Sequence, residues 1–164
     1  MKKRTVLAGL LALGQAILAA SPASAASTNA SGAAALALAG VVAGHSPVLS
    51  STDRRVMARL FADRPVTFPA DRKLTVAASS IECRISGTDI ASRTCELGFD
   101  ERRHGARKVA LSGRAASEVF AALAAAGAGS GEVAKVSGLS CTIDPNEIRR
   151  RAGRGADCVF EKGE

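Results

Sequence analysis

The chain has 164 residues, with 22 Lys and Arg against 15 Asp and Glu, which gives a formal net charge of +7. This length accommodates a single domain with short appendages. The sequence contains no Trp, no Tyr and five Phe, which disfavours the aromatic stacking platforms of nucleic-acid-binding proteins.

Residues 1–25 have the pattern of a signal peptide. A basic start (Lys2, Lys3 and Arg4) precedes an apolar run from Val6 of about 15 residues, and small residues follow. A run of this length falls short of the roughly 20 residues that span a bilayer, so no transmembrane span is expected once the signal is removed. Loss of the signal lowers the net charge to +4. We expect a periplasmic or secreted protein.

Residues 26–50 are rich in Ala, Gly and Ser. Small side chains bury too little area to offset the entropy of ordering the backbone. The segment is therefore predicted to be a flexible leader, with a nascent helix over residues 33–42. The folded domain is expected to cover residues 51–164.

After this segment, apolar residues recur first with a helical spacing and then with the alternating spacing of strands. A helix is predicted over residues 53–63, capped by Ser51 or Thr52. From Leu74 the period becomes two, and its phase changes at Ser79 and Ser80, which indicates a bulge or a break between two short strands.

The second half of the chain starts with a charged connection over residues 100–108. A long helix is predicted over residues 113–126, and the Gly-rich residues 127–131 are interpreted as a flexible linker. Further along, Asp144 can cap a short helix that has Pro145 at its first position. We expect this helix over residues 145–152.

Two stretches of sequence resemble each other. Each begins with Cys-x-Ile, at Cys83 and at Cys141, and each ends with a second cysteine, Cys95 or Cys158, shortly before a Phe. This pattern predicts one strand–connection–strand unit used twice. Four cysteines in an exported chain indicate disulfides, and the repeat favours the pairs Cys83–Cys95 and Cys141–Cys158. Zinc is the alternative, but structural zinc sites usually contain closely spaced cysteine pairs.

These elements predict an α+β domain. We expect a short antiparallel sheet of four to six strands, covered on one face by one longer helix and containing two disulfide-stapled strand–connection–strand units.

Candidate catalytic residues are sparse. His45 and His104 are the two histidines, and neither a nucleophile elbow, a phosphate-binding loop nor a metal-binding His motif is present. The sequence therefore predicts no catalytic residue, no metal site and no cofactor.

Two basic clusters are candidate contacts for an anion or a partner. Arg149, Arg150, Arg151 and Arg154 form one, and the other lies in the charged connection with Arg102 and Arg103. Cations at the end of a helix are also favourable on dipole grounds alone, so solvation is the alternative interpretation of the first cluster.

The closing segment, CTIDPNEIRRRAGRGADCVFE, resembles the ends of small exported bacterial proteins with two disulfide-closed strand pairs. This resemblance covers residues 74–161 and implies no function. The chain is also similar to small secreted inhibitor domains with two disulfides, but no inhibitory motif matches residue by residue.

The leading functional hypothesis is an exported, non-enzymatic interaction module that binds a protein or an anionic component of the cell envelope. The alternatives are a small periplasmic hydrolase whose site residues are dispersed in the sequence, and a structural envelope protein without a specific ligand.

Overall fold

A computed structural model describes residues 27–69, 71–101, 105–151 and 153–163. The expected signal peptide (residues 1–25) lies outside these ranges and stays a prediction. The same holds for Arg102, Arg103 and His104.

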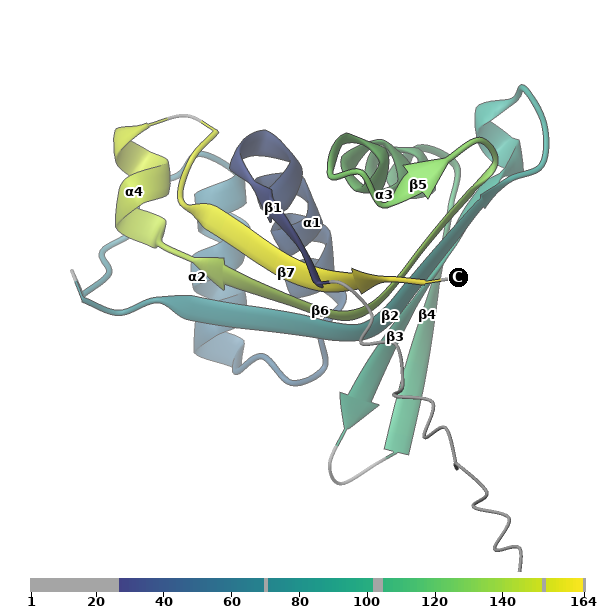
Figure 1. The fold of residues 1–164 in the computed structure, drawn as a ribbon. Helices are drawn as coiled ribbons and strands as arrows, with labels where there is room; N and C mark the ends of the chain where they lie inside the picture. The colour runs from purple at the N-terminus through teal and green to yellow at the C-terminus, as the bar shows by residue number, and fades with distance from the viewer. Residues whose placement is uncertain (1–26, 70, 102–104, 152, 164) are drawn as a thin grey trace, which may run out of the picture.

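The core of the fold is an antiparallel sheet with the strand order β1-β7-β6-β2-β3-β4 (Figure 1). A further two-residue strand, β5, pairs with β6. The strands are β1 (Ser27–Ser31), β2 (Leu74–Ile85), β3 (Arg93–Glu101), β4 (Gly105–Ser112), β5 (Gly129–Ser130), β6 (Val133–Ile143) and β7 (Ala156–Lys162). The expected α+β class with an antiparallel sheet is confirmed.

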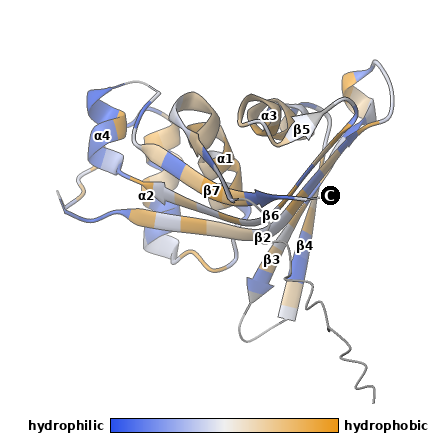
Figure 2. Cartoon of the chain, in the orientation of Figure 1, coloured by the Kyte–Doolittle hydropathy of each residue, from blue (hydrophilic) through white to orange (hydrophobic). Residues whose placement is uncertain are grey.

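Two helices, rather than the expected one, cover the same side of this sheet (Figure 1). Helix α1 (Gly32–His45) packs against β7, β6 and β2, and α3 (Gly113–Ala125) packs against β3, β4 and β2. The two helices also pack against each other. Their apolar residues meet the apolar side of the strands, which alternate in hydropathy along their length (Figure 2).

The nascent helix predicted over residues 33–42 lies within α1, but the prediction of a flexible leader is wrong for residues 27–45. β1 pairs with β7 along its whole length, and α1 buries five residues in the core: Ala35, Leu38, Ala39, Val42 and Ala43. Small side chains allow α1 to pack closely on the sheet, and the pairing of β1 satisfies its backbone groups. The folded domain therefore includes β1 and α1, which precede the boundary expected near Ser51.

The other helices lie close to their predicted positions. Helix α2 (Ser51–Phe61) is capped by Ser50 rather than by Ser51 or Thr52, and the Ser50 Oγ accepts a 3.0 Å hydrogen bond from the Asp53 N–H. Helix α3 ends at Ala125, within one residue of the expected end. Helix α4 (Pro145–Arg150) is capped by Asp144, as predicted. The expected Gly-rich linker, in contrast, contains β5.

The two cysteine stretches form two hairpins of the same design. A 3-10 turn, η1 (Ile90–Ser92), connects β2 to β3, and α4 connects β6 to β7. Both expected disulfides are present, each between directly paired residues of its hairpin: Cys83–Cys95 and Cys141–Cys158. Each bond closes a short loop, which stabilises the fold by about 3 kcal/mol in the chain-entropy account.

The repeat extends beyond the hairpins to the edge strands and the helices. β4 leads into α3 through Gly113, and β1 leads into α1 through Gly32, and both glycines have positive φ. The Sγ of Cys95 lies 3.3 Å from a carbonyl oxygen of α3, and that of Cys158 lies 3.5 Å from a carbonyl oxygen of α1. One unit is therefore β2-β3-β4-α3, and the other is β6-β7 completed by β1-α1 from the beginning of the chain. A pseudo-twofold axis between β2 and β6 relates them.

Strand β2 is continuous through Ser79 and Ser80, where the sequence predicts a bulge or a break. Its buried residues change phase between Ala78 and Ile81, and those of β6 change phase at the paired position, between Val136 and Leu139. The register between the two strands is the same on both sides of this point. Because both strands change phase together, the buried residues on both sides of this point join one core.

Removal of a core side chain from α1 tests whether residues 27–45 belong to the folded domain. Leu38 is 1% exposed, so Leu38→Ala should lower the free energy of unfolding by about 3 kcal/mol. Ala33→Ser, at an exposed position of the same helix, should change it by less than about 0.5 kcal/mol. Urea unfolding monitored by circular dichroism measures both. Equal, negligible effects would mean that α1 is not part of the cooperative unit.

Candidate functional site

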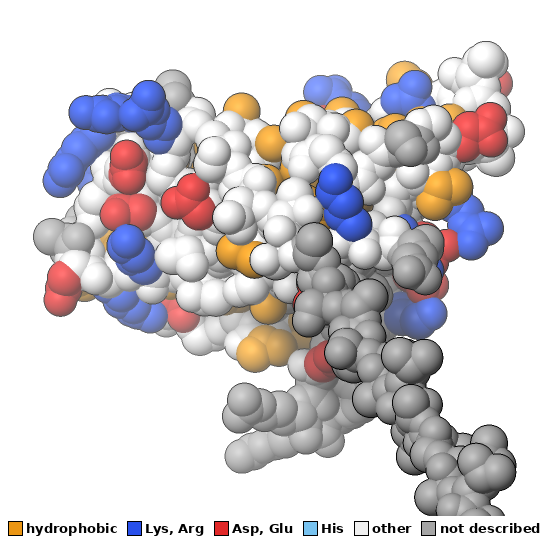
Figure 3. All heavy atoms as spheres, in the orientation of Figure 1, with side chains coloured by type: hydrophobic (Ala, Val, Ile, Leu, Met, Phe, Trp, Pro, Cys, Tyr) orange, Lys and Arg blue, Asp and Glu red, His pale blue; other side chains and the backbone are white. Residues whose placement is uncertain are grey.

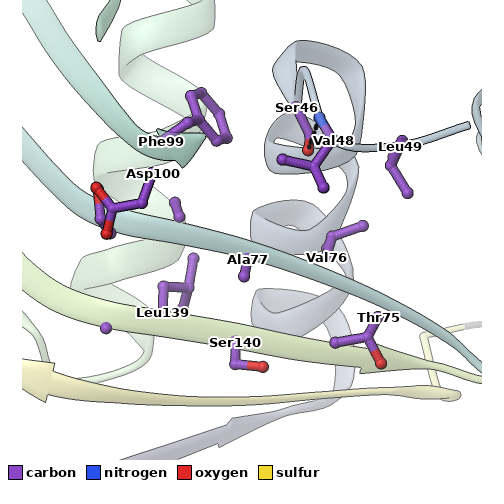
Figure 4. Close-up of a pocket in the computed structure, with 13 residues that line it drawn as sticks. Ser46, Val48, Leu49, Thr75, Val76, Ala77, Phe99, Asp100, Leu139 and Ser140 are labelled. Atoms are coloured by element: carbon purple, nitrogen blue, oxygen red, sulfur yellow. Dashed lines mark hydrogen bonds between the residues drawn. The ribbon is translucent and has the colours of Figure 1, made fainter. Parts of the chain in front are cut away.

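One hollow lies beside the first half of β2, and residues 138–140 of β6 line it as well. We call it the sheet-edge groove, and its volume is about 380 Å³. Figure 4 shows the end of β3 on one side of it and the loop after α1 on the other. The lining residues are Ser46, Val48, Leu49, Thr75, Val76, Ala77, Ala78, Ser79, Phe99, Asp100, Gly138, Leu139 and Ser140.

The groove exists because β3 leaves β2 early. Pairing between these strands extends only from Ser80 to Ile85, and β3 continues beyond this point paired with β4 alone. Figure 1 shows β3 and β4 turning away from the first half of β2. No described strand pairs with the edge of residues 74–79 that faces away from β6. Alternate backbone N–H and C=O groups of an unpaired edge are free to bind another chain.

The opposite wall is the loop over residues 46–49, which is held at the end of α1. Ser46 is 4% exposed, and its N–H donates to the Val42 carbonyl at 2.8 Å. The Arg54 guanidinium donates to the Ser46 carbonyl at 3.1 Å. Val48, in contrast, is 71% exposed. Ser46 thus anchors the loop to the protein, while Val48 exposes an apolar side chain to solvent.

The chemistry of the groove suits binding rather than proton transfer. Its walls combine apolar side chains with Ser and Thr hydroxyls, and among the described lining residues Asp100 alone carries a charge. Clefts of a few hundred Å³ with mainly apolar walls and a few polar groups are typical binding sites.

A second hollow, of about 520 Å³, lies between α1 and α2. The Phe61 ring lies against Gly40, where an added Cβ would come within 3.1 Å of it, and Gly44 has open space beside it. Its charged lining residues, Arg54 and Glu118, are both engaged, by the Ser46 carbonyl and by Arg114.

The structure places the first predicted basic cluster on and just after α4. All four arginines are exposed, and Figure 3 shows basic side chains gathered at this end of the molecule. Arg149 is also bound within the protein, because its guanidinium donates to the Val66 carbonyl at 2.7 Å. A contact role for this cluster stays a prediction. The other cluster, Arg102 and Arg103, lies outside the described residues.

Two side chains of the sheet, Glu82 on β2 and Lys108 on β4, have shifted pKa values. The pKa of Glu82 is lowered, mainly by a hydrogen bond from Arg84 (Nε to Oε1, 3.0 Å) and by the charge of that guanidinium. The pKa of Lys108 is raised by its ion pair with Glu96, 2.7 Å away. Both shifts arise from solvent-exposed ion pairs, so they indicate surface electrostatics rather than a catalytic site.

No cluster of three or more potential metal ligands occurs in the described part of the chain. His45 is exposed, and its Nδ1 donates to the Val41 carbonyl at 2.9 Å, so it closes the end of α1 instead of facing a nucleophile. Within the same ranges, no helix combines the length and the apolarity that crossing a membrane requires.

Comparisons with protein-family models, curated proteins and solved structures found no match to this chain.

The residues of the sheet-edge groove were not predicted as a site. The sequence did contain one signal, the change of phase at Ser79 and Ser80, but the groove also depends on where β3 separates from β2 and on the path of residues 46–49.

Neighbouring arginines of α4 should differ in their effect on stability. Arg149→Ala removes the hydrogen bond to the Val66 carbonyl and leaves that acceptor near the buried Val66 side chain, so it should cost about 1–2 kcal/mol. Arg150→Ala, at a neighbouring position that is exposed like that of Arg149, leaves the Val66 hydrogen bond in place and should cost less than about 0.5 kcal/mol. Urea unfolding of both variants measures the difference, and equal small effects would show that the Arg149 bond does not stabilise the fold.

The ion pair of Glu82 can be tested by titration. Arg84→Gln should raise the pKa of Glu82 towards its ordinary value, because Arg84 is the main cause of the shift. Since the folded pKa is lowered, the pair stabilises the fold at neutral pH, and this contribution is lost as the pH falls through the Glu82 pKa. NMR of the side-chain carboxyl carbons measures this. Arg114→Gln, which removes the partner of Glu118, is the control and should leave Glu82 unchanged.

Proposed function

We propose that this protein is a non-enzymatic interaction module that binds a segment of another protein in the periplasm or outside the cell. The observation that carries the proposal is the sheet-edge groove, which combines an unpaired stretch of β2 with apolar walls. Exposed backbone groups next to apolar pockets are the two elements that peptide-binding sites of this kind use.

The scaffold around the groove supports this proposal. β2 and β6 are central strands, and each belongs to a hairpin closed by a disulfide. A rigid frame lowers the entropic cost of binding because the site is formed before the partner arrives. Two disulfides also suit an oxidising compartment, which supports the exported location.

The groove is better suited to binding than to hydrolysis. A hydrolytic site requires a base within hydrogen-bond reach of a nucleophile. The hydroxyl groups in the groove lie beside apolar side chains and one carboxylate, while His45 is bound to the Val41 carbonyl.

Site-specific photo-crosslinking tests the proposal. Benzoylphenylalanine at Val48, which is 71% exposed in the groove, should give a discrete crosslinked adduct in cells. The same residue at Val159, an exposed valine on β7, is the matched control and should not give it. Val48→Asp in an untagged competitor should fail to suppress the adduct, whereas the wild-type competitor should suppress it. Identical patterns from both positions would contradict a binding function of this groove.

A further inference from the structure

The proposed interaction function can be carried one step further, to the form of the partner. We propose that the open edge of β2, residues 74–79, accepts an extended peptide of a partner protein as an additional strand of the sheet. This inference rests on the function proposed above and specifies how the bound segment is held.

In the unit that contains β6, the equivalent strand edge is paired. β5 pairs with β6 at Val133 and Ala134, on the edge opposite to β2. Immediately beyond, the Gly163 N–H donates to the Lys135 carbonyl at 2.9 Å. The first half of β6 is thus covered by short extended segments from elsewhere in the chain.

The pseudo-twofold axis relates this covered edge to the open edge of β2. The relation that places Cys83 on Cys141 also places residues 75–77 on residues 133–135. Residues 75–79 all line the sheet-edge groove. The groove is therefore the place of a strand that one unit contains and the other lacks.

The chain's own candidate for this position does not fill it. β5 follows α3 after a short turn, and the segment that follows α1 in the same way is residues 46–49. Pro47 has no N–H to donate, and the Val48 N–H lies 3.4 Å from the Ser46 Oγ. Residues 46–49 form no β pairing with β2 and instead make the far wall of the groove.

The lining indicates the chemistry of the bound peptide. Val48 and Leu49 provide an apolar wall on one side, and Phe99 and the carboxylate of Asp100 lie on the side of β3 (Figure 4). In an extended chain, alternate side chains point to opposite sides. We therefore expect a segment of about five residues with alternating apolar side chains and a Lys or Arg near Asp100, which matches the length of the open edge at about 3.3 Å per residue.

Selection of peptides provides the probe. A displayed random library of peptides of about ten residues, panned on the full chain, should enrich the alternating apolar pattern with a basic residue near one end. Enriched peptides are then synthesised and their affinities measured by calorimetry. Failure to enrich any peptide, or enrichment of peptides without this pattern, would overturn the proposal.

N-methylation of the synthetic peptides separates backbone pairing from side-chain contacts. Methyl groups on alternate amides block one edge of the peptide, so one set should weaken binding at least about tenfold and the other set should have little effect. Equal sensitivity or insensitivity of the two sets would exclude strand addition. If the Val48 crosslink persists in that case, the interaction function stands and only the mode of binding is wrong.

Amide hydrogen exchange locates the bound strand on the protein. In the free chain, the outward-facing amides of residues 74–79 should exchange rapidly, and the peptide should protect them at least about tenfold. The amides of β6 that face β2 are paired in both states and serve as the internal reference. Strong protection in the free chain would show that the protein's own segment fills the edge, and this would overturn the proposal.

Three variants complete the test. Asp100→Asn should weaken binding of a basic peptide about two- to fivefold, as expected for an exposed ion pair. Val48→Asp should weaken binding further, because it places a charge in the apolar wall. Val159→Asp, on β7, should have no effect, and an effect equal to that of Val48→Asp would place the site elsewhere.

Discussion

The antiparallel pairing of β2 with β6 is the constraint on which the rest of the structure depends. The two strands are paired over almost their full length in a single register, and each carries one cysteine of its hairpin. A shift by one residue would turn the apolar side of one strand towards solvent. Because the register is constant, the change of phase in β2 must be matched in β6, and the buried residues on both sides of this change join one core.

Local signals in the sequence were sufficient for the hairpins but not for the beginning of the domain. The matched Cys-x-Ile stretches predicted both disulfides, and Asp144 with Pro145 predicted α4, since these features act within a few residues. A nascent helix was predicted within α1, over residues 33–42, but its burial was not, because its Ala, Gly and Val residues leave it apolar on every side, without a stripe that marks a buried face. Its burial is decided by the pairing of β1 with β7, which lies at the other end of the chain.

The candidate site was less predictable than the fold, for a similar reason. A groove at a sheet edge is defined by where pairing stops, and pairing is a property of two strands rather than of one stretch of sequence. The sequence pattern places Val48 in a leader and residues 75–79 in an ordinary strand, so neither segment is marked as part of a site. The difference between the two units, a covered edge on β6 and an open one on β2, is visible only when they are compared in three dimensions.

The contact between β1 and β7 has a consequence for the order in which the domain forms. The first described strand has its sheet partner in the last described one, so the second unit remains incomplete until β7 has been synthesised. Contacts between distant parts of a sequence slow folding because a large loop must close before they stabilise the structure. The first unit, in contrast, is made of consecutive elements from β2 to α3. It can therefore assemble earlier and present β2 as the template on which β6, β7 and finally β1 and α1 are added.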